Sequence, residues 1–102
     1  EDHVSMGANA ARHALEILDN VRYILAIELL TAAQAIDLRP DGPGRLGRGT
    51  AAAYGQVRDQ VAFLEHDRET SSDMETLAEL IRTGEVLESV QAALAAHPTQ
   101  SA

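Results

Sequence analysis

The chain has 102 residues, a length that suits one domain at most. Eight basic residues, all arginine, and sixteen acidic residues give a formal net charge of −8, so the clustered positive charge that binds nucleic-acid phosphates is missing. Cysteine is absent, which excludes a disulfide framework, a thiolate nucleophile and a zinc ribbon. No basic-then-apolar signal peptide opens the chain, and we expect a reducing, cytoplasmic setting.

The composition favours helices over sheets, because aromatic residues make up only 3% and Ala, Leu, Ile and Val supply most of the apolar content. Apolar residues recurring at steps of three and four predict a long helix from about Val4 to Ile36. Such a helix spans roughly 50 Å, whereas a compact domain of about 100 residues has a radius of gyration of about 13 Å. Because it is apolar on several sides, we expect it to pack against helices from outside the chain.

This helix is not expected to cross a membrane. Its most apolar run, from Tyr23 to Ile36, is shorter than the roughly 20 residues that a membrane span needs, and Glu28 lies within it. Glu28 and Gln34 are the polar residues of interest there. We expect both to be buried and satisfied by interhelical contacts rather than to take part in catalysis.

Residues 37–49 hold two prolines and four glycines, which stop the long helix and predict an irregular loop. The loop lacks the glycine spacing of a phosphate-binding loop, so a plain crossover is favoured over an anion site. Thr50 is the predicted N-cap of a second helix, about Ala51 to Val61.

Two further helices are predicted after that. Ser72 and Glu75 form an S-x-x-E capping box that opens the third helix, and Gly84 ends it. A fourth helix runs from about Glu85 to Ala96. The predicted fold is therefore all-α. Residues 1–36 form an N-terminal segment with the long helix, and residues 37–49 form a Gly/Pro loop. Residues 50–97 form three short helices, and residues 98–102 form a frayed tail.

Candidate sites within the sequence are few. Glu1-Asp2-His3 and Glu65-His66-Asp67 combine acids with histidine, but adjacent residues rarely converge on one ion, so solvated polar turns are expected rather than a metal site. His13 and Glu16 are three apart on the long helix and are expected to form a surface contact. No serine has the context of a catalytic nucleophile, so the chain alone holds no complete active site.

Several short motifs nevertheless occur in a specific order along essentially all of the chain. They are Glu1-Asp2-His3-Val4-Ser5-Met6, Leu25-Ala26-Ile27-Glu28, Gln34-Ala35-Ile36-Asp37-Leu38-Arg39, Gly49-Thr50-Ala51-Ala52-Ala53-Tyr54, Phe63-Leu64-Glu65-His66-Asp67-Arg68 and Asp73-Met74-Glu75. Together they closely resemble the histidine ammonia-lyase (histidase) family, in which a Q-E-D-H-V-S-M segment precedes a long helix.

The resemblance implies that the chain is the C-terminal fifth or so of a longer, mostly helical enzyme. Such enzymes are homotetramers with a central helix bundle, and they eliminate ammonia from an amino acid; histidine gives urocanate. Their electrophile is a methylidene-imidazolone formed from an internal Ala-Ser-Gly. That triad is absent from this sequence, and the family's catalytic Tyr and carboxylate-binding Arg are also expected outside the chain. The resemblance therefore implies that the chain alone is inactive.

Glu1 is the one active-site position that the resemblance carries over. It matches the Glu of the Q-E-D-H motif, which lies near the substrate side chain, where a carboxylate can accept an imidazole N–H or handle its proton. Relatives acting on phenylalanine or tyrosine generally have an amide at this position, so Glu1 favours histidine. His3 and Ser5 also match, and we expect them to shape the segment rather than to catalyse.

Two alternatives remain open at this point. One is a tyrosine or phenylalanine ammonia-lyase, or an aminomutase, of the same fold. The other, from a different class of function, is a stand-alone helical oligomerisation module, which would explain the missing catalytic set.

Overall fold

The computed structural model describes the backbone of residues 2–96 and the side chains of residues 6–96. The described part contains helices and no strand, which confirms the all-α prediction. The elements are α1 (Asp2–Leu38), a short 3₁₀ helix η1 (Gly42–Arg45), α2 (Arg48–Gln60), α3 (Ser71–Thr83) and α4 (Glu85–Ala95).

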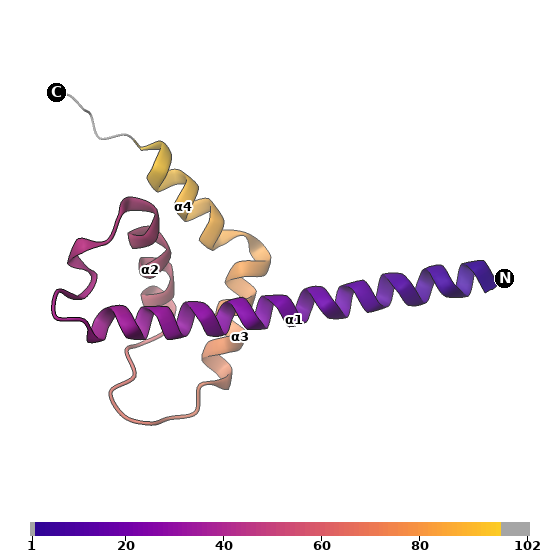
Figure 1. Cartoon of the computed structure of the whole chain (residues 1–102), viewed down its shortest axis with the longest axis horizontal. Helices are drawn as coiled ribbons and strands as arrows, with labels where there is room; N and C mark the ends of the chain where they lie inside the picture. Colours follow the sequence, from indigo (N-terminus) through magenta and orange to yellow (C-terminus); the bar gives the residue numbers. More distant parts are fainter. Residues whose placement is uncertain (1, 97–102) are drawn as a thin grey trace.

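Helix α1 has 37 residues and extends well beyond the other helices (Figure 1). The radius of gyration is 17.8 Å, against about 13 Å for a compact chain of this length. The extents of 64 × 42 × 17 Å describe a flat, elongated molecule. The prediction that the first helix is longer than the globule around it is therefore confirmed.

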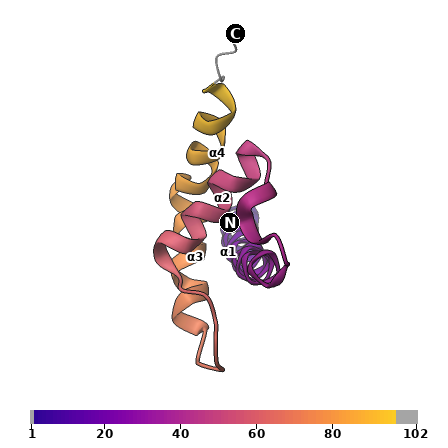
Figure 2. The same cartoon turned by 90° about the vertical axis from the view of Figure 1, so that its left-hand side faces the viewer.

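The core lies where the C-terminal half of α1 meets the shorter helices. α1 packs mainly on α3, and α2 mainly on α4, while α3 and α4 lie end to end (Figures 1 and 2). On α1 the buried residues are Ala26 and Ala33, whose small side chains let neighbouring helices approach closely. The other buried residues are Val57, Val61, Leu77, Ala78 and Leu80.

The predicted start of α2 is wrong by three residues, because the helix begins at Arg48 and not at Ala51. Gly47, with extended backbone, is the N-cap, and its carbonyl accepts the first helical hydrogen bond from Ala51 N at 2.8 Å. Thr50 therefore lies inside the first turn and does not cap the helix. Threonine is a favoured N-cap residue, but here the helical backbone begins at Arg48, before Thr50 is reached.

The predicted capping box of α3 is also wrong. Thr70 is the N-cap, without a side-chain capping bond, and its carbonyl accepts from Met74 N at 3.0 Å. Ser71 and Ser72 already lie in the helix, so Ser72 is two positions beyond the N-cap and cannot form a capping box with Glu75. Ser71 Oγ instead donates to Glu69 Oε2 at 2.9 Å.

Later boundaries agree with the prediction to within one residue. Gly84 ends α3 in the left-handed conformation, with φ 84° and ψ 5°, and α4 begins at the next residue and ends at Ala95. The loop after α1 contains η1, which adds one ordered turn to a segment predicted to be irregular. The predicted frayed tail, 98–102, lies outside the described residues.

Among residues 2–96, no helix combines the length and the apolar character that crossing a membrane requires.

Candidate functional site

The sequence-predicted site residue Glu1 lies outside the described residues, directly before the first residue of α1. His3 and Ser5 belong to the first turns of α1 by their backbone, and their side chains also lie outside the described set. The structure therefore does not test the role of Glu1, which stays a prediction.

The other histidine-containing candidates lie at the surface. His13 Nδ1 and Glu16 Oε1 are 4.0 Å apart, and their side chains are 74% and 70% exposed, so the predicted surface contact is confirmed. Glu65, His66 and Asp67 are all exposed. Within the part of the chain whose side chains are described, no three histidine or acidic side chains gather closely enough to hold a metal ion.

Gln34 forms the polar contact expected of it. Its Nε2 donates to Leu64 O at 2.9 Å, and its Oε1 accepts from Leu64 N at 3.1 Å. The amide thereby satisfies both backbone groups of a residue in the non-helical segment that joins α2 to α3. Two points differ from the prediction: the partner is a loop backbone and not another helix, and Gln34 is half-buried rather than buried.

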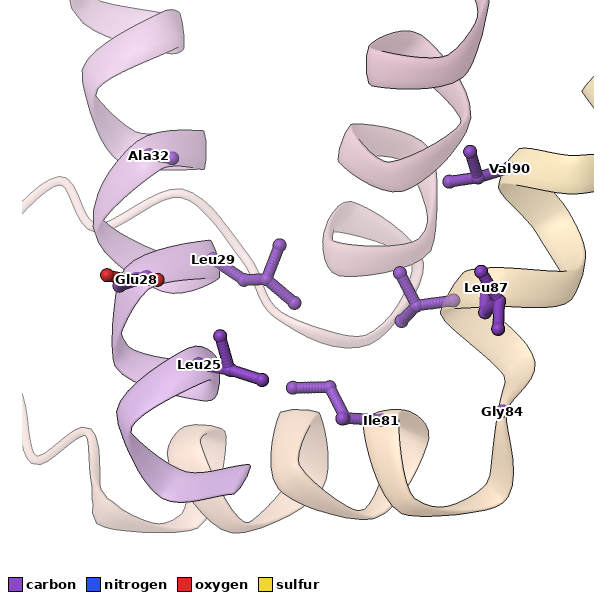
Figure 3. A pocket seen from close by; sticks show the side chains of 9 residues that line it. Leu25, Glu28, Leu29, Ala32, Ile81, Gly84, Leu87 and Val90 are labelled. Atoms are coloured by element: carbon purple, nitrogen blue, oxygen red, sulfur yellow. The ribbon is translucent and has the colours of Figure 1, made fainter. Parts of the chain in front are cut away.

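The expectation that Glu28 is buried is wrong for this chain. The side chain is exposed, and Glu28 is among the residues that line the apolar groove beside α1 (Figure 3). The short helices cover the face of α1 that carries Ala26 and Ala33, and Glu28 lies outside that face.

A polar cluster that the sequence analysis missed joins α1 to α2. Asp37, in the last turn of α1, accepts hydrogen bonds from the Tyr54 hydroxyl through Oδ1 and from Arg58 Nε, at 2.8 Å, through Oδ2. The Asp37 and Arg58 side chains are both only 15% exposed. Tyr54 and Arg58 are four apart on α2, a spacing that places them on one face, and this was the available signal.

Arg58 makes further contacts around this cluster. Its guanidinium carbon lies 5.8 Å from the centroid of the Tyr54 ring and 6.0 Å from that of the Phe63 ring. Nη1 donates to Val61 O at 3.0 Å, whereas Nη2 is buried without a hydrogen-bond partner. The hydrogen bond to Asp37, followed by burial, raises the pKa of Tyr54 above its usual value of 10.0. The cluster fixes the end of α1 against α2, and both oxygens of its carboxylate are already paired with Tyr54 and Arg58.

An apolar groove of about 540 Å³ lies between α1 and the α3–α4 corner. In Figure 3, Leu25 and Leu29 point from α1 toward Ile81 and the first turns of α4. The remaining lining residues are Glu28, Ala32, Gly84, Val86, Leu87 and Val90. The groove offers apolar contact and no set of groups for bond-making chemistry.

Comparison with known proteins identifies the family to which these helices belong. The family model described as aromatic amino acid lyase matches residues 1–59, which is more than half of the chain. The chain belongs to the aromatic amino acid lyase family. The match takes in α1 and nearly all of α2, so the Asp37 cluster of this lyase chain lies within the family region.

Similar proteins include several histidine ammonia-lyases. Histidine ammonia-lyase of Symbiobacterium thermophilum is 52% identical over 92 residues, covering 90% of this chain. Those of Natranaerobius thermophilus and Gloeobacter violaceus are 50% and 48% identical and cover 89% and 91% of the chain. The chain spans about 18% of the length of each of these relatives. No solved structure matches it.

Proposed function

We propose that the chain is the C-terminal part of a histidine ammonia-lyase, which removes ammonia from L-histidine without oxidation and releases urocanate. The observation that carries this proposal is the identity of 48–52% to proteins named histidine ammonia-lyase, over about nine-tenths of the chain. Because the chain spans about 18% of those proteins, the activity belongs to a longer polypeptide, and we expect the chain alone to be inactive.

The electrophile of this reaction is a methylidene-imidazolone formed from an internal Ala-Ser-Gly. The 102 residues contain no Ala-Ser-Gly, so they cannot be the source of the group. We therefore assign to this chain no step that passes through it. The first test is to read the gene upstream of residue 1: an Ala-Ser-Gly in a long helical enzyme supports the proposal, and a start codon near residue 1 contradicts it.

Within this proposal, Glu1 contacts the imidazole of the substrate. A carboxylate can accept a hydrogen bond from the ring N–H or hold its proton during the reaction. An ionised carboxylate facing a benzene ring would instead lose its hydration without gaining a partner. This difference favours histidine over phenylalanine and tyrosine as the substrate.

The test of Glu1 uses the full-length enzyme. Glu1→Gln should lower kcat for urocanate formation by about 100-fold, since positioned acid–base groups contribute at least about that factor. Glu88→Gln, at an exposed position of α4, is the matched control and should leave the rate unchanged. An unchanged rate in Glu1→Gln would remove Glu1 from the mechanism.

Parallel assays with histidine, phenylalanine and tyrosine separate this proposal from an aromatic ammonia-lyase or an aminomutase. Urocanate as the main product supports it. Cinnamate, coumarate or a β-amino acid as the main product would point to the alternative enzymes.

The proposal also includes assembly into a homo-oligomer, which is a tetramer in the histidine ammonia-lyase family. It places the longer enzyme in the cytoplasm. The support for assembly in this chain is the part of α1 beyond the short helices, which exposes large apolar residues on several sides: Leu15, Ile17, Leu18, Val21 and Ile24. The same surface is what a stand-alone oligomerisation module would need, so the upstream gene decides between the two.

A further inference from the structure

One apolar stripe of α1 continues into the groove beside α4. Its residues follow one another at steps of three or four, a spacing that places them on one face of a helix: Leu18, Val21, Leu25, Leu29 and Ala32. The first two are 44% and 42% exposed and lie N-terminal to the groove residues, whereas the last three line the groove. The groove is therefore one section of a longer apolar surface along α1.

The opposite wall of the groove comes from the α3–α4 corner (Figure 3). Ile81, Val86, Leu87 and Val90 supply this wall, and Leu87 is 60% exposed. The wall lies beyond residue 59, where the match to the family model ends. The match to the Symbiobacterium thermophilum relative covers 90% of the chain, which is too much to leave residues 81–90 outside it. Both walls of the groove therefore belong to the part of the chain that matches a longer enzyme.

The lining of the groove suits a helix better than a small molecule. Among the described lining residues Glu28 alone carries a charge, and the others are aliphatic residues, alanine and glycine. Sites for small molecules normally combine apolar walls with several convergent polar groups, which this lining does not offer. An amphipathic helix, in contrast, binds by laying its aliphatic face into a groove between two helices.

A helix of this kind can come from the rest of the same polypeptide. The chain spans about 18% of the length of its relatives, so more than four-fifths of that length lies outside it. A segment of the same polypeptide is held near the groove at a high effective concentration by its covalent connection. A second copy would first have to lose its freedom of movement on association, which costs free energy. The missing length therefore favours an occupant from the same subunit.

We propose that the groove binds a helix with an aliphatic face from the part of the same subunit that precedes Glu1, and that the α3–α4 corner holds this helix against α1. The inference rests on the proposed function in one respect, namely that the chain is the C-terminal part of a longer enzyme. Leu25 and Leu87, which are exposed in this chain, become buried by the helix. A basic side chain at the edge of the helix complements the charge of Glu28.

Photo-crosslinking in the full-length enzyme identifies the occupant. The photoreactive amino acid p-benzoylphenylalanine replaces Leu87 in one variant, and in the matched control it replaces Glu88, which is exposed and does not line the groove. After irradiation, we expect the Leu87 variant to give a crosslinked peptide from upstream of Glu1, in a species with the mass of one subunit on a denaturing gel. The Glu88 variant should lose this crosslink, because neighbouring residues point to different sides of a helix.

A charge placed in the groove tests its burial by an independent measurement. Leu87→Asp in the full-length enzyme should lower Tm, because the new carboxylate would lie among aliphatic side chains. Gln91→Asp adds the same charge at an exposed position of α4 that does not line the groove, and it should leave Tm unchanged. Urocanate formation by the unaltered enzyme tests the proposed function separately, so a failure of that function and a failure of this inference are distinguishable.

Four results would overturn the proposal. A Leu87 crosslink in a species with the mass of two subunits would show that a second copy fills the groove. Crosslinked peptides confined to residues 1–102 of the same subunit would show that the groove closes on itself. A Leu87 variant that crosslinks no more than the Glu88 variant, or an unchanged Tm in Leu87→Asp, would show that the groove stays open to water.

Discussion

Gln34 and Leu64 are thirty residues apart in the sequence and share two hydrogen bonds, one in each direction, between the Gln34 amide and the Leu64 backbone. The side-chain amide thus takes the place of a neighbouring peptide group. It holds the segment between α2 and α3 against α1, where Leu64 is half-buried.

Gln34→Ala should lower the free energy of unfolding by about 1–3 kcal/mol, because it leaves both backbone groups of a half-buried residue without partners. Gln34→Glu should also destabilise the chain, since a carboxylate cannot donate to the Leu64 carbonyl. Urea unfolding at one fixed protein concentration measures both effects. Gln91→Ala, on the exposed side of α4, is the control; an equal loss there would show that the paired amide contributes nothing specific.

Substitutions of Asp37 and of its partner Tyr54 are expected to lower the free energy of unfolding by different amounts. Asp37→Asn removes the charge that pairs with Arg58 and should lower the free energy of unfolding by about 1–3 kcal/mol. Tyr54→Phe should cost less than Asp37→Asn, because Arg58 Nη2 has no partner and can donate to the carboxylate oxygen that the phenol releases. If Tyr54→Phe were the more damaging substitution, this account of the cluster would be wrong.

The raised pKa of Tyr54 predicts a dependence of stability on high pH. The folded chain holds the phenol proton more tightly than the unfolded chain, mainly through the hydrogen bond to Asp37. This contribution to stability is fully present below pH 10 and is lost as the pH rises through the raised pKa. Titration of phenolate absorbance in a Tyr23→Phe background should give a midpoint above 10, which Asp37→Asn should lower toward the ordinary value.

The regular parts of the fold could be predicted because their signal is spread over many residues. The apolar periodicity of α1 runs from Leu18 to Ile36, which is about five turns, so an error at one position changes little. Single-residue signals were less dependable: Thr50 and Ser72 have good capping side chains, yet backbone geometry placed the caps at Gly47 and Thr70.

The Asp37 cluster could not be predicted from local pattern. Asp37 lies 17 residues from Tyr54 and 21 from Arg58, and only the loop path across residues 39–47 brings them together. The exposure of Glu28 was missed for a related reason, because apolar residues surround it in sequence whereas the helices that pack on α1 cover a different face. Glu1, taken from family resemblance, stays a prediction.

Two glycines with opposite roles provide a matched pair of substitutions. Gly84→Ala should lower the free energy of unfolding by about 1–2 kcal/mol, because φ of 84° strains any residue with a Cβ. Gly55→Ala, inside α2, should instead raise it by about 0.5–1 kcal/mol, since alanine is the better helix former. At neither position would a Cβ meet another atom within 4 Å, so the contrast isolates backbone conformation. Equal changes in the free energy of unfolding at the two positions would contradict this explanation by backbone conformation.

The exposed half of α1 predicts self-association of the isolated chain. Ile17 and Ile24 are about half exposed on α1, whose N-terminal part extends beyond the other helices (Figure 1), and exposed apolar surface of this kind usually marks an interface. Sedimentation velocity at tens of micromolar should therefore show oligomers. Ile24→Glu should shift the distribution toward monomer, because assembly would bury an unpaired charge. Asn9→Glu adds the same charge at an exposed polar position of the same helix and should have a smaller effect. A monomeric profile for the unaltered chain would remove the support that α1 gives to the oligomer.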